Sequence, residues 1–343
     1  MKDNPFSLNF GKEPYRMVSR QMQMNEIIET FESDTPSSST YLITGVRGSG
    51  KTVTMMSVIN EMKNRKKWIT VTLNPSRDLL TSLAANLYEN PLVKPAFIKA
   101  DISINFVVSA SLTSNGPSAD VDVQLKKMLK IIDAMGIRVL IAVDEVNKSD
   151  NLRIFAGSYQ MLLGEGYPLF LIMTGLYENI RSLQDDKSLT FLYRAPRIEL
   201  KPLSIIGMSR NYMEVFDISE EEADRMAEFT KGYSYAFQVL GYIRYKRKAP
   251  LDKLIQEFDE IMSEYSYEKI WDELSARDKE IVRLLAENGR MKVKDIQDIT
   301  GMSSGSFSTY RQRLGRGGII SIKEYGYCEI MLPRFAEIVN RWK

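Results

Sequence analysis

The sequence of 343 residues contains no histidine and a single cysteine, Cys328. The lack of histidine excludes Ser-His-Asp and Cys-His nucleophile systems, and it excludes histidine-ligated metal sites. One cysteine cannot form an intrachain disulfide, so the composition is unlike that of a disulfide-stapled secreted protein. Acid–base chemistry must therefore rest on carboxylates, lysines or tyrosines. This suits phosphoryl transfer, in which positioning and electrostatics supply most of the catalysis.

Long hydrophobic runs and a strong excess of charge are also lacking. The longest apolar runs, such as Val139–Val143, are too short to span a bilayer, and Met1 to Phe10 has no apolar stretch of the signal-peptide type. We therefore expect a cytoplasmic protein with no membrane partner. The net charge is only +2, so any nucleic-acid site must be a local patch.

The most informative motif is Gly-Val-Arg-Gly-Ser-Gly-Lys-Thr at residues 45–52. It follows the β-prone residues Tyr41–Thr44 and precedes a helical stretch from Val53 to Lys66, which is the strand–turn–helix context of a phosphate-binding P-loop, or Walker A motif. A chance match in a surface loop is the alternative, and the flanking strand and helix disfavour it. The residues that we expect to bind ATP are Gly45, Val46, Arg47, Gly48, Ser49, Gly50, Lys51 and Thr52.

Each residue type in this loop has a physical role. Gly45 and Gly50 allow backbone angles that a β-carbon would forbid, so successive N–H groups can point at one anion. We expect Lys51 to contact the β- and γ-phosphates and Thr52 to ligate Mg²⁺.

A second motif, of the Walker B type, ends the buried apolar run Val139–Val143 with Asp144 and Glu145. Ligands in open α/β sheets bind at the carboxyl ends of strands. We expect Asp144 to hold Mg²⁺ through its water shell and Glu145 to act as the general base on the attacking water. The alternative is a strand that ends in a solvated acidic turn.

Two further candidates follow in the sequence. Thr174 ends the apolar run Phe170–Thr174 and is a candidate for contacting the γ-phosphate or the attacking water; otherwise its hydroxyl satisfies a local backbone group. Arg194 is a candidate arginine finger, acting in its own subunit or in a neighbour, or else forms a structural ion pair. Arg197 lies nearer the last strand and is the weaker candidate.

Buried strands alternate with helices from residue 41 onward, which predicts a parallel α/β sheet. The predicted strands are Tyr41–Thr44, Trp68–Leu73, Val139–Val143, Leu169–Thr174 and Ile198–Leu200. Ile102–Leu112 could add a pair of strands, with a Ser/Gly/Pro loop from Thr113 to Asp120. Residues 203–265 read as purely helical. The predicted domains are therefore 1–202, 203–267 and 268–343.

The last domain has the spacing of a winged helix-turn-helix, with helices at Ala276–Glu287, Val293–Thr300 and Ser304–Leu314 and strands at Ile319–Lys323 and Tyr327–Leu332. Val293, Ile296 and Ile299 form one predicted apolar face, and Phe307, Tyr310 and Leu314 form another. Arg311, Arg313 and Arg316 make a basic run. The predicted contacts with double-stranded DNA are Ser304, Ser308, Thr309, Gln312, Arg313, Arg316 and Lys323.

An ordered set of segments resembles a known family. Asn4-Pro5-Phe6, Thr44–Thr52, Val143–Val146, Thr190–Ala195 and the run from Gly232-Tyr233 to Tyr242 follow in the order typical of AAA+-type P-loop ATPases of the origin-recognition and archaeal-ATPase branch. More narrowly, the chain resembles bacterial ATP-binding proteins with a C-terminal winged helix. The resemblance covers nearly the whole chain. Ser234 departs from it, because relatives usually carry proline there.

The resemblance implies a P-loop NTPase fold with a 5-1-4-3-2 parallel sheet, helices on both faces, a helical lid and a winged helix. It also implies that Tyr15, Val18 and the lid helix close over adenine. The sequence thus predicts a slow, DNA-associated ATPase that requires Mg²⁺. Two alternatives remain: a nucleotide switch of the STAND type that acts by assembly or by binding a protein, and a transcription regulator with little turnover.

Overall fold

The structure, a computed structural model, describes residues 3–9, 15–16, 18, 20–102, 119–186 and 189–342. Its internal contacts divide the chain into two compact units. Residues 20–44 and 54–199 form the sheet unit, and residues 1–19, 45–53 and 200–343 form the lid unit. The extra strands predicted in Ile102–Leu112, and most of the loop predicted after them, lie outside the described residues.

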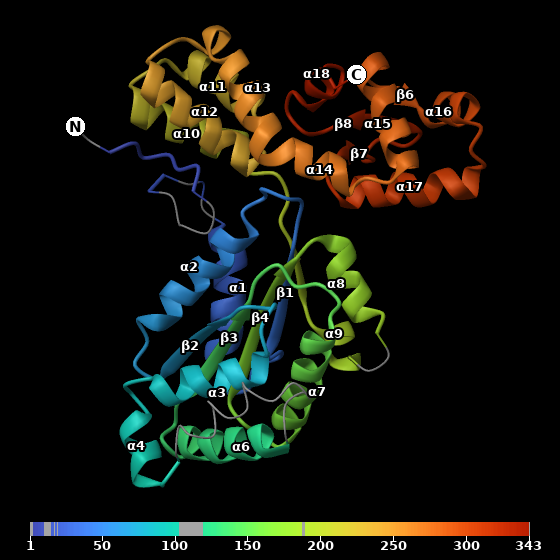
Figure 1. Cartoon of the computed structure of the whole chain (residues 1–343). Helices are drawn as coiled ribbons and strands as arrows, with labels where there is room; N and C mark the ends of the chain where they lie inside the picture. The colour runs from blue at the N-terminus through green and yellow to red at the C-terminus, as the bar shows by residue number, and fades with distance from the viewer. Residues whose placement is uncertain are drawn as a thin grey trace. The chain divides into compact units, whose positions relative to one another are not determined.

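The sheet unit is built on five parallel strands (Figure 1). They are β1 (Thr40–Thr44), β2 (Trp68–Leu73), β3 (Arg138–Val143), β4 (Leu169–Gly175) and β5 (Arg197–Glu199). Their order is β2-β3-β4-β1-β5, which confirms the predicted 5-1-4-3-2 sheet. Because all strands run in the same direction, the carboxyl ends of β1, β3 and β4 lie at one edge. Val143 pairs with Met173, and Thr44 pairs with Gly175.

Helices cover both faces of this sheet, as Figure 1 shows. They are α1 (Gln21–Glu32), α2 (Lys51–Lys63), α3 (Leu79–Glu89), α4 (Lys94–Lys99), α6 (Ala119–Ala134), α7 (Asp150–Gly164), α8 (Tyr177–Gln184) and α9 (Thr190–Arg194). Strand side chains alternate between the faces. Leu42 and Ile141 join the apolar core with α3, α6 and α7, whereas Tyr41 and Phe170 pack against Phe31 of α1. Burial on both faces explains the continuous apolar runs in the sequence.

The longest segment of the lid unit, residues 200–343, begins with a set of helices, as predicted for residues 203–265. They are α10 (Ile205–Phe216), α11 (Glu220–Phe229), α12 (Ser234–Arg247), the 3₁₀ turn η1 (Leu251–Lys253), α13 (Ile255–Met262), the π-helical turn η2 (Ser263–Tyr267) and α14 (Glu268–Glu273). Ser204 and Ser219 begin α10 and α11 as N-caps that accept backbone N–H bonds. The helical run from α13 through η2 to α14 is continuous, and it crosses the predicted domain boundary between residues 267 and 268. The predicted domain boundaries stay a prediction.

The C-terminal residues form helices and a small three-stranded sheet, and the predicted winged helix-turn-helix stays a prediction. The elements are α15 (Ala276–Asn288), β6 (Met291–Lys292), α16 (Val293–Thr300), α17 (Ser304–Arg316), β7 (Ile320–Ser321), β8 (Tyr327–Ile330) and α18 (Phe335–Val339). The antiparallel strands have the order β6-β8-β7. The sequence did not predict β6, because two residues are too few to show an alternating pattern. None of the described helices has an apolar stretch long enough to cross a membrane.

The apolar faces predicted for this domain agree with the structure except at one residue. Phe307 and Leu314 are each 1% exposed, and Tyr310 is half-buried. Ile299 is 59% exposed, so the predicted apolar face of Val293, Ile296 and Ile299 is buried only in part. The helix α16 has only two turns, and Ile296 alone is fully buried on it.

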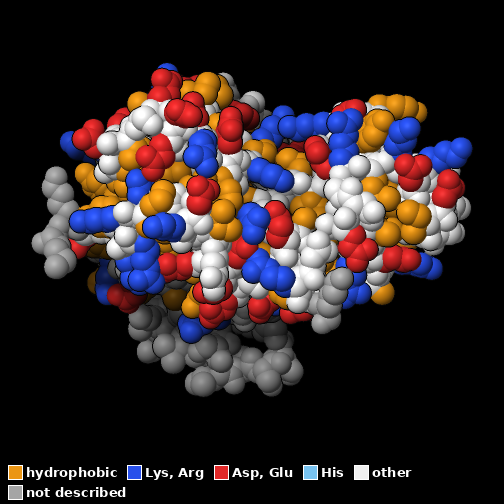
Figure 2. Space-filling view, turned by 90° about the horizontal axis from the view of Figure 1, so that it is seen from above, with side chains coloured by type: hydrophobic (Ala, Val, Ile, Leu, Met, Phe, Trp, Pro, Cys, Tyr) orange, Lys and Arg blue, Asp and Glu red, His pale blue; other side chains and the backbone are white. Residues whose placement is uncertain are grey.

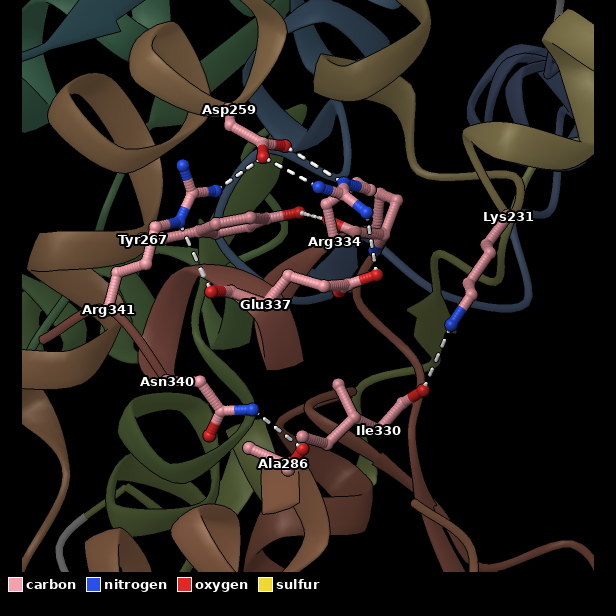
Figure 3. A network of polar contacts seen from close by, with 10 residues as sticks. Lys231, Asp259, Tyr267, Ala286, Ile330, Arg334, Glu337, Asn340 and Arg341 are labelled. Carbon is pink, nitrogen blue, oxygen red and sulfur yellow. Dashed lines mark hydrogen bonds and ion pairs between the residues drawn. The ribbon is translucent and has the colours of Figure 1, made fainter. Parts of the chain in front are cut away.

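A buried carboxylate joins the lid helices to the C-terminal residues (Figure 3). Asp259 of α13 is only 3% exposed and forms ion pairs with Arg334, at 2.8 Å, and with Arg341. Nearby, the Lys231 amine donates to the carbonyl of Ile330 at 3.2 Å. A single apolar cluster also runs through both segments, with Phe258 on one side and Phe335 on the other. Residues 200–343 therefore pack as one body.

We predict that Asp259→Ala lowers the free energy of unfolding of the lid unit by about 3 kcal/mol, because two arginines lose the buried acceptor that they share. Urea titration of the full chain, followed by tryptophan fluorescence, measures the change. The control is Asp252→Ala, since Asp252 is 73% exposed and pairs with Arg225 at 3.5 Å. That variant is expected to lose less than about 0.5 kcal/mol. Equal midpoints for the two variants would contradict a structural role for Asp259.

Candidate functional site

The glycine-rich loop lies between the end of β1 and the first turn of α2. Gly48 and Gly50 have φ angles of 74° and 90°, in the left-handed region that other residues rarely adopt. The Lys51 amine donates to the carbonyls of Gly45, at 3.1 Å, and Val46, at 2.9 Å. These two bonds hold the charged Lys51 amine against the loop, which leads into α2. The loop therefore has the shape and charge of an anion site.

The outer side of the loop is covered by the start of α12. Three successive residues, Tyr233–Tyr235, donate hydrogen bonds to three successive loop carbonyls. The bonds run from Tyr233 Oη to Arg47 O, from Tyr235 N to Gly48 O at 3.1 Å and from Ser234 Oγ to Ser49 O at 3.0 Å. The tyrosine approaches so closely that a β-carbon at Gly48 would lie 2.4 Å from its oxygen. The loop carbonyls thus have partners on the lid side.

The loop also contacts the C-terminal part of the same unit. A β-carbon at Gly318, which lies just before β7, would be 2.2 Å from Val46 Cγ1, so Val46 packs directly on that glycine. Arg47 and Glu273 of α14 approach to 3.8 Å. The loop therefore packs against both the lid helices and the residues just before β7.

The N-terminal segment docks on the lid helices. Gln238 of α12 accepts from the backbone N–H of Ser7 at 3.0 Å and donates to the carbonyl of Arg16 at 2.8 Å. Val18 is half-buried, and one of its methyl carbons lies 3.0 Å from where a β-carbon on Gly207 would be. Tyr15 is 87% exposed. The predicted adenine contacts of Tyr15 and Val18 stay a prediction.

In the sheet unit, the carboxylates after β3 meet the end of β4. The Thr174 hydroxyl donates to Asp144 Oδ1 and accepts from the backbone N–H of Glu145 at 3.2 Å. Glu145 is exposed and has a φ of 51°, which is uncommon for a residue with a side chain. Strained residues of this kind cluster at functional sites. The structure thus brings Asp144, Glu145 and Thr174 together at one edge of the sheet.

The two candidate arginines differ in their surroundings. Arg197 is held over the ring of Tyr177, 4.9 Å from its centre, and donates to Gln184 Oε1 at 3.4 Å. Arg194 ends α9 on the surface. It has no hydrogen bond or ion pair with any residue that the structure describes. Arg197 therefore has contacts within its own chain, and the role predicted for Arg194 stays a prediction.

The surface of α17 carries the short polar side chains that were predicted to face DNA. Ser304, Ser308, Thr309 and Gln312 are all exposed, as is Lys323 beyond β7. Tyr325, at the turn between β7 and β8, is 98% exposed. Figure 2 shows another face of the molecule, on which positive and negative side chains are intermixed.

Two of the arginines of α17, Arg311 and Arg313, bind groups within the C-terminal residues. Arg313 pairs with Asp278, whose side chain is 2% exposed, and donates to Ser275 Oγ at 2.9 Å. Its guanidinium also lies 5.0 Å from the centre of the Tyr310 ring. Arg311 donates to the backbone carbonyls of Ile322 and Tyr327, and Arg316 is half-buried. The predicted DNA contacts of Arg313 and Arg316 stay a prediction, while Arg313 has a clear structural role.

Sequence reasoning did not assign roles to the lid residues that contact the loop. Ser234 was noted only as a departure from the proline usual in similar proteins, and Tyr233 only as part of the run that carries the resemblance. Asp259 carried no local signal, because its partner Arg334 lies 75 residues further along the chain.

Comparisons with known proteins show the fold. The chain is similar to Cdc6p from Pyrobaculum aerophilum, with a TM-score of 0.52, 15% identity, and 99% of this chain and 97% of that chain covered. It is also similar to the ORC2 protein of Aeropyrum pernix in its ADPNP–ADP complexes, with a TM-score of 0.60, 12% identity, and 97% and 96% covered. The chain thus has the fold of the Cdc6/ORC AAA+ proteins.

Two sequence comparisons add less. Residues 264–339 match a family described as a domain of unknown function, DUF8462. No curated protein matches the sequence. Function must therefore be argued from the residues of the site.

We predict that Arg313→Ala lowers the free energy of unfolding by about 2 kcal/mol, since Asp278 is left buried without its charged partner. Thermal melting with parallel urea titration measures the change. The matched control on the same helix is Gln312→Ala, which is exposed and is expected to stay within about 0.5 kcal/mol of the parent. A loss of DNA binding with unchanged stability would instead assign Arg313 to DNA alone.

Proposed function

We propose that this protein binds ATP and hydrolyses it slowly, and that it is associated with DNA. The observation that carries the proposal is the glycine-rich loop. Its lysine amine is fixed by two loop carbonyls, two of its glycines adopt left-handed angles, and its carbonyls on the lid side have donors. The similar ORC2 structure contains ADPNP and ADP, which supports a nucleotide as the ligand.

The residues of the chain have distinct proposed roles. Lys51 and the loop N–H groups bind the β- and γ-phosphates. Glu145 accepts a proton from the attacking water as the water oxygen bonds to the γ-phosphorus. The bond from the γ-phosphorus to the oxygen that bridges the β- and γ-phosphates breaks, which releases ADP. Thr174 orients Asp144 and the backbone of Glu145. These hydroxyl and carboxylate groups are the charges and donors that phosphoryl transfer to water requires.

Magnesium fits the oxygen ligands available. No cluster of three or more His, Cys, Asp or Glu side chains suited to a metal occurs among the described residues. Mg²⁺ needs no such cluster, because it keeps several waters and binds substrate phosphates with one or two protein oxygens. We propose the hydroxyl of Thr52 and, through water, the carboxylate of Asp144 as those ligands. When bound, the ion neutralises phosphate charge.

We propose that nucleotide binding is coupled to DNA binding through contacts within the lid unit. The loop contacts both α12 and Gly318 at the foot of the wing, and the Asp259 ion pairs fasten the lid helices to the C-terminal residues. We propose that the winged helix contacts double-stranded DNA through the exposed polar face of α17 and through Lys323. Nucleotide binding would then change DNA affinity through directly packed side chains.

The test is ATP hydrolysis by the full chain, with and without double-stranded DNA, at low and high salt. We predict turnover that DNA stimulates, with the stimulation fading at high salt because phosphate contacts release counterions. Glu145→Gln is expected to reduce turnover about 100-fold or more while ATP still binds, since the base is lost and the loop is kept.

The matched control is Glu178→Gln, because Glu178 is an exposed glutamate just after β4. It should leave turnover unchanged. ATP binding with no turnover in the parent protein would contradict hydrolysis, and a failure to bind ATP would overturn the proposed function as a whole.

A second function, assembly driven by nucleotide, is favoured by Arg194. This side chain is exposed and has no partner among the described residues, as a residue that reaches a neighbouring subunit must be. We predict that ATP increases the molar mass measured by light scattering and that Arg194→Ala abolishes the increase. Arg181→Ala is the control, since Arg181 already pairs with Asp185 at 3.4 Å. Unchanged mass in the parent protein would reject assembly.

A further inference from the structure

The hydroxyl of Tyr233 reaches the glycine-rich loop from a fixed position. It donates to the carbonyl of Arg47 and lies 3.0 Å from Ser266 Oγ. The Tyr233 side chain is buried, and burial raises the pKa of the phenol well above its ordinary value. The group therefore remains a protonated donor at any physiological pH.

The π-helical turn η2 supports this tyrosine from the side opposite to the loop. A π-helical turn inserts an extra residue, and here two successive residues, Ser266 and Tyr267, are both buried. Ser266 contacts the Tyr233 hydroxyl, and the rings of Tyr233 and Tyr267 stack with centres 6.4 Å apart and an interplanar angle of 17°. The hydroxyl of Tyr267 in turn donates to the carbonyl of Pro333 at 2.6 Å (Figure 3).

The geometry of the peptide bond gives this contact a consequence for anion binding. In a planar trans peptide, the C=O of one residue and the N–H of the next point in opposite directions. Donors on the lid side hold the carbonyls of Arg47 and Ser49 toward the lid. The N–H groups of Gly48 and Gly50 are thereby turned away from the lid.

We propose that Tyr233 is a positioning residue of the phosphate loop. Together with Ser234, it fixes the peptide planes of residues 47–50 in the orientation that binds the β-phosphate. Its support by η2, and the bond from Tyr267 to Pro333, tie this orientation to the C-terminal residues. This role rests on the proposed nucleotide function.

The test is the affinity of the full chain for AMPPNP, ADP and AMP with Mg²⁺, measured by calorimetry. Tyr233→Phe keeps the ring and removes the donor, so it is expected to weaken AMPPNP and ADP binding about fivefold to tenfold, the effect of one hydrogen bond. AMP lacks the β-phosphate, so its affinity is expected to change less than twofold. A structural role alone would not distinguish these ligands.

The matched control is Tyr212→Phe. Tyr212 is also a fully buried lid tyrosine, and its hydroxyl donates to the carbonyl of Phe237 at 2.9 Å, away from the loop. It should keep the parent affinity for all three ligands. If Tyr233→Phe does not fold, Ser234→Ala removes the half-buried donor to Ser49 and must show the same dependence on the β-phosphate.

The outcomes separate the two proposals. If the parent protein binds AMPPNP and Tyr233→Phe or Ser234→Ala binds it equally well, the positioning role is overturned and the nucleotide function stands. Equal losses for AMP and AMPPNP would also overturn it, because the defect would not concern the phosphates. If the parent binds none of the nucleotides, the proposed function and the role of Tyr233 fail together.

Discussion

A loop that presents backbone N–H groups to an anion must satisfy its carbonyls elsewhere, because every buried backbone group needs a partner. In this protein the partners come from two directions. The Lys51 amine bonds to the carbonyls that open the loop, and the first residues of α12 bond to those in its middle. The hydrogen bonds that satisfy the loop carbonyls therefore also attach the loop to the lid helices.

The rest of the lid unit follows from this arrangement. The π-helical turn η2 supports Tyr233 in its contact with the loop, because it places Ser266 and Tyr267 against the Tyr233 side chain. That turn lies in the continuous helical run from α13 to α14, which also carries Asp259 with its two arginine partners. A buried carboxylate with two cations is a poor source of net stability, but its two ion pairs connect α13 to the residues after β8. It fixes the lid helices and the C-terminal residues as one body.

The sheet unit supplies chemistry of another kind. Parallel strands end at a common edge, so the carboxylates after β3 and the hydroxyl of Thr174 at the end of β4 meet although 30 residues separate them. Glu145 adopts a left-handed conformation there, held by the bond from its N–H to Thr174. The proposed general base is thus an exposed carboxylate with a fixed backbone, and it takes no part in the apolar core.

The sequence by itself determined the sheet, its strand order through a resemblance, the glycine-rich loop and the carboxylates after β3. These are local signals: apolar runs of strand length, glycines before a lysine, and acidic residues where an apolar run stops. Tertiary structure alone decided the role of Tyr233, the pairing of Asp259 with Arg334, the exposure of Ile299 and the commitment of Arg313 to Asp278. Each of these depends on packing between distant segments or on the length of a short helix. No pattern within a single segment specifies which partner a buried polar side chain will meet.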